Sequence, residues 1–214
     1  MKFNQYIWNL YKTSPDGQKS IERFSETRDF AQDLLLFERY CPDYIKSDQQ
    51  RIMCREMLEL LWEFKVSTHK EEEITIEDAK RIYQETISSS LVVDDCVIIK
   101  DNDYSNMLMW IPLLSMELNA WCKDIFVPYL FADRFYDLKK FADYFEIELP
   151  TIPKKADYKG RCLYYWELCE IFNDFCNENN LTMSEFCALM YDYAPNLLKE
   201  EEKGEIPQPA QAWL

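Results

Sequence analysis

Glutamates recur at helical spacing in two parts of the chain. Glu56, Glu59 and Glu63 lie three and four residues apart, and Glu167 and Glu170 lie three apart. On an α-helix, side chains at these spacings share a face. Carboxylate oxygens are the ligands that Mg²⁺ prefers, so these glutamates are candidate metal ligands. The alternative, which we favour, is a solvated acidic face, because charged helical residues mostly face water.

Two catalytic patterns extend this idea. The row formed by Glu56, Glu59 and Glu63 resembles the carboxylate rows of helical metal-dependent pyrophosphatases, but no second acidic motif follows at suitable spacing. Pro42-Asp43 with Glu63-Phe64-Lys65 matches the outline of PD…ExK nucleases, which hold Mg²⁺ between carboxylates. That site needs adjacent strands, whereas the triplet falls on a predicted helix. We therefore expect no catalytic residue, no cofactor and no metal, and keep a metal-dependent phosphoesterase or nuclease as an alternative.

A compact basic cluster is formed by Lys154, Lys155, Lys159 and Arg161. It lies just before a predicted helix, whose N-terminus itself attracts anions. The cluster is therefore a candidate site for a phosphate or an acidic peptide. The alternative, which we favour, is that its cations neutralise the surrounding carboxylates.

Eight cysteines are present, at positions 41, 54, 96, 122, 162, 169, 176 and 187, and no two form a CxxC pair. Cys162, Cys169 and Cys176 are spaced by seven, with aromatic residues between them. Residues seven apart on a helix are separated by about 10 Å, so these thiols are predicted to pack in a core rather than share a metal. The N-terminal segment has no apolar stretch of signal-peptide type, and reduced thiols are typical of the cytoplasm.

Glycine and histidine are scarce: the chain has three glycines and one histidine, His69. Glycine-rich phosphate loops and nucleophile elbows need glycines close together, and Gly17, Gly160 and Gly204 are far apart. Two-histidine metal sites are excluded within one subunit. Since tight β-hairpins also need glycine, the composition favours an all-α fold.

Apolar periodicity predicts a compact bundle of about eight or nine helices. The expected N-caps are Asn4, Ser14, Thr27, Ser47, Thr75 and Thr182. Helices are expected near residues 112–126 and 128–146, with Pro112 and Pro128 at their starts, and Pro195 is expected to end the last helix. The β-branched stretch at residues 91–99 is predicted as a short β-hairpin, a buried connection or a helix end.

The domain prediction is one helical domain at residues 1–198, with a candidate internal boundary near 150–158 at Pro150 and Pro153. Residues 199–214 form a charged, proline-containing tail that ends in Trp213 and Leu214. We expect these two residues to bind a partner or to dock on the body. Such a tail also suggests a piece of a larger multidomain protein of bacterial type.

The formal net charge is −15, from 39 acidic and 24 basic residues. This excess disfavours direct binding of nucleic acid and of anionic membranes. Tryptophan is enriched at binding hot spots, so Trp8, Trp110 and Trp213 are candidate interface anchors, with core burial as the alternative for the first two. The leading prediction is a non-catalytic protein-interaction or regulatory domain with a protein partner, which a basic surface would suit. An acidic inhibitor that mimics nucleic acid is a further alternative.

Overall fold

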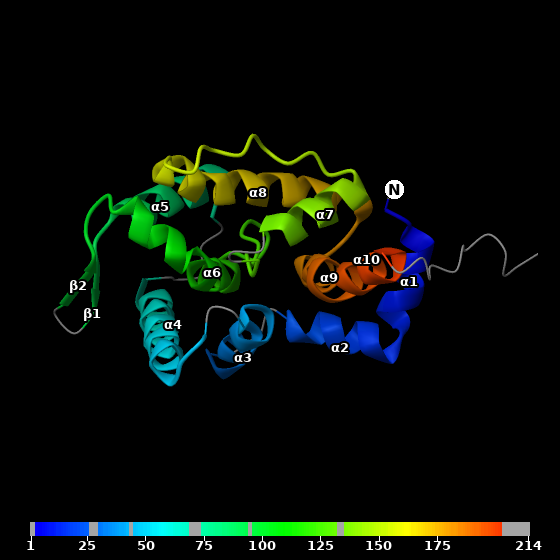
Figure 1. Ribbon diagram of the computed structural model, residues 1–214, viewed down its shortest axis with the longest axis horizontal. Helices are drawn as coiled ribbons and strands as arrows, with labels where there is room; N and C mark the ends of the chain where they lie inside the picture. The colour runs from blue at the N-terminus through cyan, green and yellow to red at the C-terminus, as the bar shows by residue number, and fades with distance from the viewer. Residues whose placement is uncertain are drawn as a thin grey trace, which may run out of the picture.

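The computed structural model describes residues 3–25, 30–42, 45–68, 74–93, 96–131 and 135–202, and the side chains of residues 60–68, 91, 93, 96, 98 and 200–202 are left aside. Within this part the chain is all-α, with nine helices, as expected (Figure 1). The first eight are α1 (Gln5–Thr13), α2 (Pro15–Arg23), α3 (Phe30–Tyr40), α4 (Asp48–Thr68), α5 (Ile76–Ser88), α6 (Tyr104–Trp121), α7 (Phe135–Phe145) and α8 (Tyr158–Asn179). The last runs without a break through α9 (Met183–Ala188), the π-helical turn η2 (Leu189–Tyr193) and α10 (Ala194–Glu202).

Most of the expected helix starts are confirmed by their capping bonds. Asn4 Oδ1 accepts from the N–H groups of Tyr6 and Ile7, and Thr182 forms a complete capping box with Glu185. Ser47 caps α4 through Gln50 N, but the Gln50 side chain accepts from Lys46 N instead of completing the box. Thr27 lies outside the described residues.

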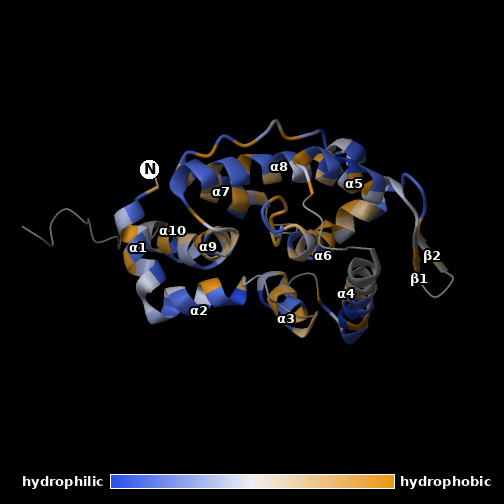
Figure 2. Cartoon of the chain, turned by 180° about the vertical axis from the view of Figure 1, so that it is seen from behind, coloured by the Kyte–Doolittle hydropathy of each residue, from blue (hydrophilic) through white to orange (hydrophobic). Residues whose placement is uncertain are grey.

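Helix α6 is the centre of the fold. It packs against α3, α4, α5 and α8, and residues 110–119 are all buried. Figure 1 shows α6 between α4 and α8, with the hairpin at one end of the molecule and α1 at the other. Figure 2 shows hydrophilic residues along α2, α5 and α8, which cover the outside. A long central apolar helix is typical of a bundle that buries one element on all sides.

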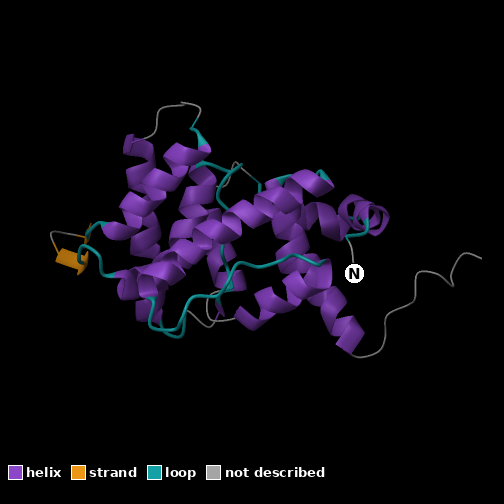
Figure 3. Cartoon of the chain, turned by 90° about the horizontal axis from the view of Figure 1, so that it is seen from above, coloured by secondary structure: helices purple, strands orange, loops and turns teal. Residues whose placement is uncertain are grey.

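The short β-hairpin is confirmed by the antiparallel strands β1 (Leu91–Val93) and β2 (Cys96–Ile99). It projects from the helical body, as the view from above shows (Figure 3). Val92 pairs with Val97, and both side chains are about half exposed. Only Ile99 of the strand residues described is fully buried, so the hairpin adds little to the core.

The two helices expected around Pro112 and Pro128 are placed differently by the structure. Helix α6 begins at Tyr104 and passes through Pro112, which is buried inside it. Ser115 Oγ donates to the Pro112 carbonyl at 2.8 Å, which gives that carbonyl a local partner. The second predicted helix, near 128–146, is wrong in its first part, since α7 begins only at Phe135.

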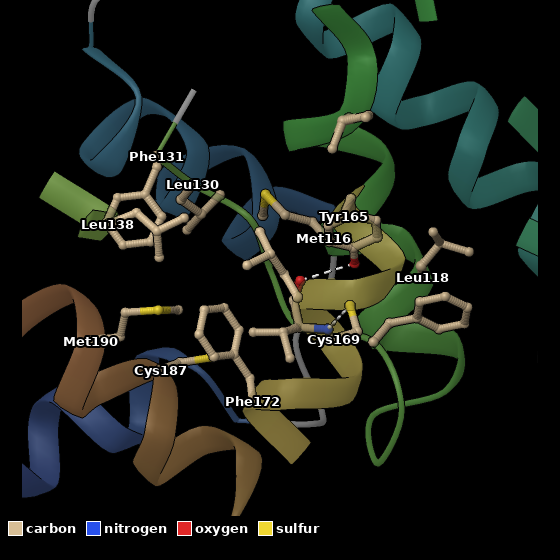
Figure 4. Close-up of a cluster of buried hydrophobic side chains, with 14 of the residues drawn as sticks. Met116, Leu118, Leu130, Phe131, Leu138, Tyr165, Cys169, Phe172, Cys187 and Met190 are labelled. Carbon is tan, nitrogen blue, oxygen red and sulfur yellow. Dashed lines mark hydrogen bonds between the residues drawn. The ribbon is translucent and has the colours of Figure 1, made fainter. Parts of the chain in front are cut away.

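Residues 126–131 form a buried connector without regular secondary structure. Side chains from α6, α8 and η2 bind its backbone, the last through Tyr191 Oη, which accepts from Leu130 N. Asn119 Nδ2 donates to Phe126 O at 2.9 Å, Tyr165 Oη donates to Val127 O at 2.9 Å, and Val127 N contacts Cys169 Sγ at 3.5 Å. Figure 4 shows the two bonds from α8 within the core cluster. These bonds replace the helical ladder, because buried backbone groups need partners.

Pro195 does not end the last helix, contrary to expectation. In a regular α-helix its ring would collide with the carbonyl of Tyr191, four residues earlier. The π-helical turn η2 lies directly before it, and Ala194 N bonds to Leu189 O, five residues back. This wider turn accommodates the proline, and α10 continues through Glu202. The domain end at residue 198 stays a prediction.

Gly17 is required where α1 and α2 meet. A Cβ atom at this position would lie 2.0 Å from the Tyr11 carbonyl oxygen, a backbone atom that cannot rotate away. Ser14 Oγ accepts from Gly17 N at 3.1 Å and begins α2 there. This glycine therefore allows the close contact between α1 and α2.

Candidate functional site

The candidate metal-binding glutamates lie on separate exposed surfaces. Glu56 and Glu59 are exposed on α4, and the side chain of Glu63 lies outside the described part. Glu167 is exposed on α8, while Glu170 pairs with Lys80 Nζ at 3.6 Å. Both helices pack on α6. Across the described residues, no three His, Cys, Asp or Glu side chains gather where they would hold one metal ion.

Several other candidates are buried or lie outside the described part. Trp8 is 1% exposed and Trp110 is 6% exposed, which corresponds to the core alternative for both. Asp43, His69, Trp213 and Leu214 lie outside the described residues. The partner-binding role expected of Trp213 and Leu214 stays a prediction.

The members of the basic cluster at residues 154–161 lie in different surroundings in the structure. Lys154 and Lys155 are exposed, and Lys159 Nζ lies 5.8 Å from the ring centroid of Tyr104. Arg161 is half-buried and lines a pocket. The N-terminus of α8 is itself capped, because Asp157 Oδ1 accepts from Gly160 N at 2.9 Å. Of this cluster, Arg161 therefore lines a concave surface, and the three lysines do not line it.

That concave surface, which we call the α4–α6–α8 pocket, has a volume of about 650 Å³. Its wall comes from the N-terminal half of α4, the first half of α6 and the first half of α8, with Ile152 and Pro153 from the α7–α8 connection. Small-molecule sites commonly have volumes of about 300–1,000 Å³. This pocket was not expected from the sequence, because its wall is assembled from segments that are distant along the chain.

Large apolar side chains remain exposed around the mouth of the pocket. Met53, Met109, Ile152 and Tyr158 all line it, and their exposed fractions are between 43 and 56%. They come from α4, α6, the α7–α8 connection and α8. Exposed apolar groups that gather around a concave surface mark binding sites. We call these four side chains the apolar rim.

The polar groups of the pocket are cationic or neutral. Lys46 and Arg161 are its charged residues, and no Asp or Glu is among its described lining residues. Trp110 Nε1 and Tyr164 Oη are shielded from solvent and have no hydrogen-bond partner among the described residues. Burial, with a further contribution from Glu167, raises the pKa of Tyr164 to about 12, so its hydroxyl is a donor at neutral pH. Burial also raises the pKa of the Cys54 thiol to about 11.

The thiol stripe of α8 is buried, as expected for core packing. Cys162, Cys169 and Cys176 are at most 5% exposed, and burial raises the pKa of each thiol from its ordinary value of 9.0 to about 12. The thiolate is the nucleophilic form of cysteine. These thiols therefore stay protonated and unreactive in the folded chain.

Alkylation should reveal this protection directly. We expect that raising the pH from 7 to about 9 accelerates iodoacetamide labelling of unfolded Cys162, Cys169 and Cys176 but not of the folded thiols. This difference follows from the raised pKa of the folded thiols, because they keep their protons over the pH range in which the unfolded thiols release them. Mass spectrometry after timed labelling, with and without urea, measures this. Labelling of any of the three before the half-exposed Cys122 in the folded chain would contradict it.

A second polar cluster centres on Asp192 in η2. Its carboxylate accepts hydrogen bonds from Ser20 Oγ and Arg23 Nη1, both on α2, and from Tyr40 Oη on α3 at 2.8 Å. Burial, followed by the negative charge of Asp192, raises the pKa of Tyr40 to about 12. Arg23 Nη1 also donates to Tyr40 Oη at 3.0 Å. Because its members satisfy one another, this cluster joins α2 and α3 to the C-terminal helix.

Comparison of the chain with known protein families, with curated proteins and with solved structures finds no match. Among the described helices, none combines the length and apolar character needed to cross a membrane.

Proposed function

We propose that the chain is a non-catalytic helical domain that binds and regulates a protein partner in the cytoplasm. The observation that carries the proposal is the apolar rim of the α4–α6–α8 pocket. Its two methionines, Met53 and Met109, are flexible and polarisable, which suits a surface that adapts to a partner. The net charge of −15 favours a basic partner, whose cations would lie beyond the pocket, because no Asp or Glu is among the described residues that line it.

The chemistry of the described nucleophiles supports binding rather than catalysis. Burial raises the pKa of the Cys54, Cys162 and Cys169 thiols, so all three are poor nucleophiles at neutral pH. The described cysteines are free thiols, which is in keeping with the proposed cytoplasmic location.

Site-specific photo-crosslinking tests the proposal. A benzophenone amino acid replaces Met109 of the rim or, in a matched control, Leu10 of α1. These side chains are 52% and 57% exposed, so they differ in place rather than in accessibility. We expect a discrete crosslinked protein from Met109 and none from Leu10, in cells that produce the full chain.

A charge variant tests whether the Met109 crosslink reflects specific binding at the rim or a chance encounter. Met53→Glu places a carboxylate on the rim and should abolish the Met109 crosslink. The free energy needed to bury this charge in the contact would exceed the free energy gained from apolar burial. Equal labelling from Met109 and Leu10, or none from Met109, would reject the proposal.

A further inference from the structure

The α4–α6–α8 pocket is positively charged within a strongly acidic chain. Lys46 and Arg161 line it, and the net charge of the whole chain is −15. Within the described part of the chain, neither cation forms an ion pair with a carboxylate. Anionic ligands are therefore drawn to this pocket in preference to the surrounding surface.

Two donors of the wall residues are buried beneath the surface of the pocket. Trp110 and Tyr164 are 6% and 7% exposed, and the indole N–H and the phenol O–H find no acceptor among the described residues. Buried polar groups are hydrogen-bonded in nearly all native structures. The raised pKa of Tyr164 keeps its hydroxyl protonated, and an indole N–H can only donate. Both groups lack an acceptor among the described residues, but solvent does not reach them, so they are not part of the surface that a ligand in the open pocket would touch.

The rest of the wall is apolar. Leu108, Ile111, Phe135 and Leu168 line the pocket, and the apolar rim surrounds its mouth. A small inorganic anion would leave this surface and most of the 650 Å³ unfilled. A ligand with an aromatic or acyl body would cover it and gain the free energy of apolar burial.

We infer that the α4–α6–α8 pocket binds a small amphipathic anion, with an acidic head group at Lys46 and Arg161 and an apolar body against the wall. The inference uses the same pocket as the proposed function and adds a small-molecule ligand beneath the partner contact. Because the rim borders the pocket, an occupied pocket presents a different surface to the partner. The ligand would in this way regulate the interaction.

A matched pair of fluorescent probes tests the inference on the full chain. Anilinonaphthalene sulfonate and its uncharged parent, phenylnaphthylamine, share one aromatic body and brighten when it is buried. We expect the sulfonate to bind about tenfold or more tightly than the parent, since charge-assisted hydrogen bonds are worth about one such factor each. Unlabelled dodecanoate should displace the sulfonate probe.

Single variants connect the preference to the pocket. Lys46→Gln and Arg161→Gln should each lower the affinity for the sulfonate about tenfold and leave that for phenylnaphthylamine unchanged. Tyr164→Phe should leave both affinities nearly unchanged, because this hydroxyl is shielded from the open pocket. Lys154→Gln is the matched control: this lysine belongs to the same basic segment but does not line the pocket.

The outcomes are distinguishable from those of the proposed function. Equal affinity for the two probes, or sulfonate binding that survives both Lys46→Gln and Arg161→Gln, would overturn the anion assignment. Binding of neither probe would overturn the ligand site as a whole. A missing crosslink at Met109 with selective sulfonate binding intact would count against the protein partner alone.

Discussion

Replacing Asp192 with alanine is expected to lower the free energy of unfolding by about 3 kcal/mol, because it removes three hydrogen bonds in a partly buried cluster, and bonds to charged groups contribute about 1.5–3 kcal/mol each. The carboxylate accepts from Ser20 and Arg23 of α2 and from Tyr40 of α3. Its side chain is 14% exposed and that of Arg23 is 27% exposed, so water only partly replaces the lost bonds. Helices α2 and α3 lose their common acceptor on η2 in one substitution.

Urea unfolding followed by circular dichroism measures the effect. The matched control is Asp143→Ala, which removes an exposed carboxylate that bonds to Lys139 Nζ at 2.9 Å. Exposed pairs of this spacing contribute only about 0.3–0.5 kcal/mol. A loss of unfolding free energy below about 1 kcal/mol for Asp192→Ala would show that the cluster does not hold α2 and α3 to the C-terminal helix.

The helices and their starts could be predicted from local sequence. Ser14-Pro15 begins α2 and Thr182 with Glu185 begins α9, because capping residues bind backbone groups only two or three positions away. The seven-residue spacing of Cys162, Cys169 and Cys176 likewise indicated one buried face of α8. Such features depend on neighbours along the chain and need no knowledge of the tertiary fold.

The errors in the fold prediction have a common physical cause. Residues 128–131 were predicted as the start of a helix, yet Pro128 O accepts from Tyr191 Oη and Leu130 N donates to it, and Tyr191 lies on another helix. Pro195 reads as a helix end because the π-helical turn before it has no local sequence signature. Partners far away in sequence decide both cases.

The pocket was only partly visible in the sequence. Arg161 was named as a candidate anion ligand, and it does line the α4–α6–α8 pocket, but Lys154, Lys155 and Lys159 do not. Its companion Lys46 lies before α4, in a different part of the chain. Nothing in local spacing joins Lys46 to Arg161, because α6 brings the two helices together.

The substitution Tyr191→Phe is expected to cost about 2–3 kcal/mol of unfolding free energy, since unsatisfied buried polar groups cost about 1–3 kcal/mol each. The Tyr191 hydroxyl donates to Pro128 O at 2.5 Å and accepts from Leu130 N at 2.9 Å. Phenylalanine keeps the ring contacts with Phe24 and Phe131 and removes only these two bonds to the connector.

Urea unfolding of Tyr191→Phe beside Tyr6→Phe isolates the role of the hydroxyl. Tyr6 is 71% exposed, and the same loss of an oxygen there should change the unfolding free energy by less than about 0.5 kcal/mol. Hydrogen exchange should also quicken at Leu130 N, whose proton loses its acceptor. An unchanged stability would mean that the connector holds its shape without η2. A loss of the expected size would show that η2 fixes the connector through Tyr191, just as it joins α2 and α3 through Asp192.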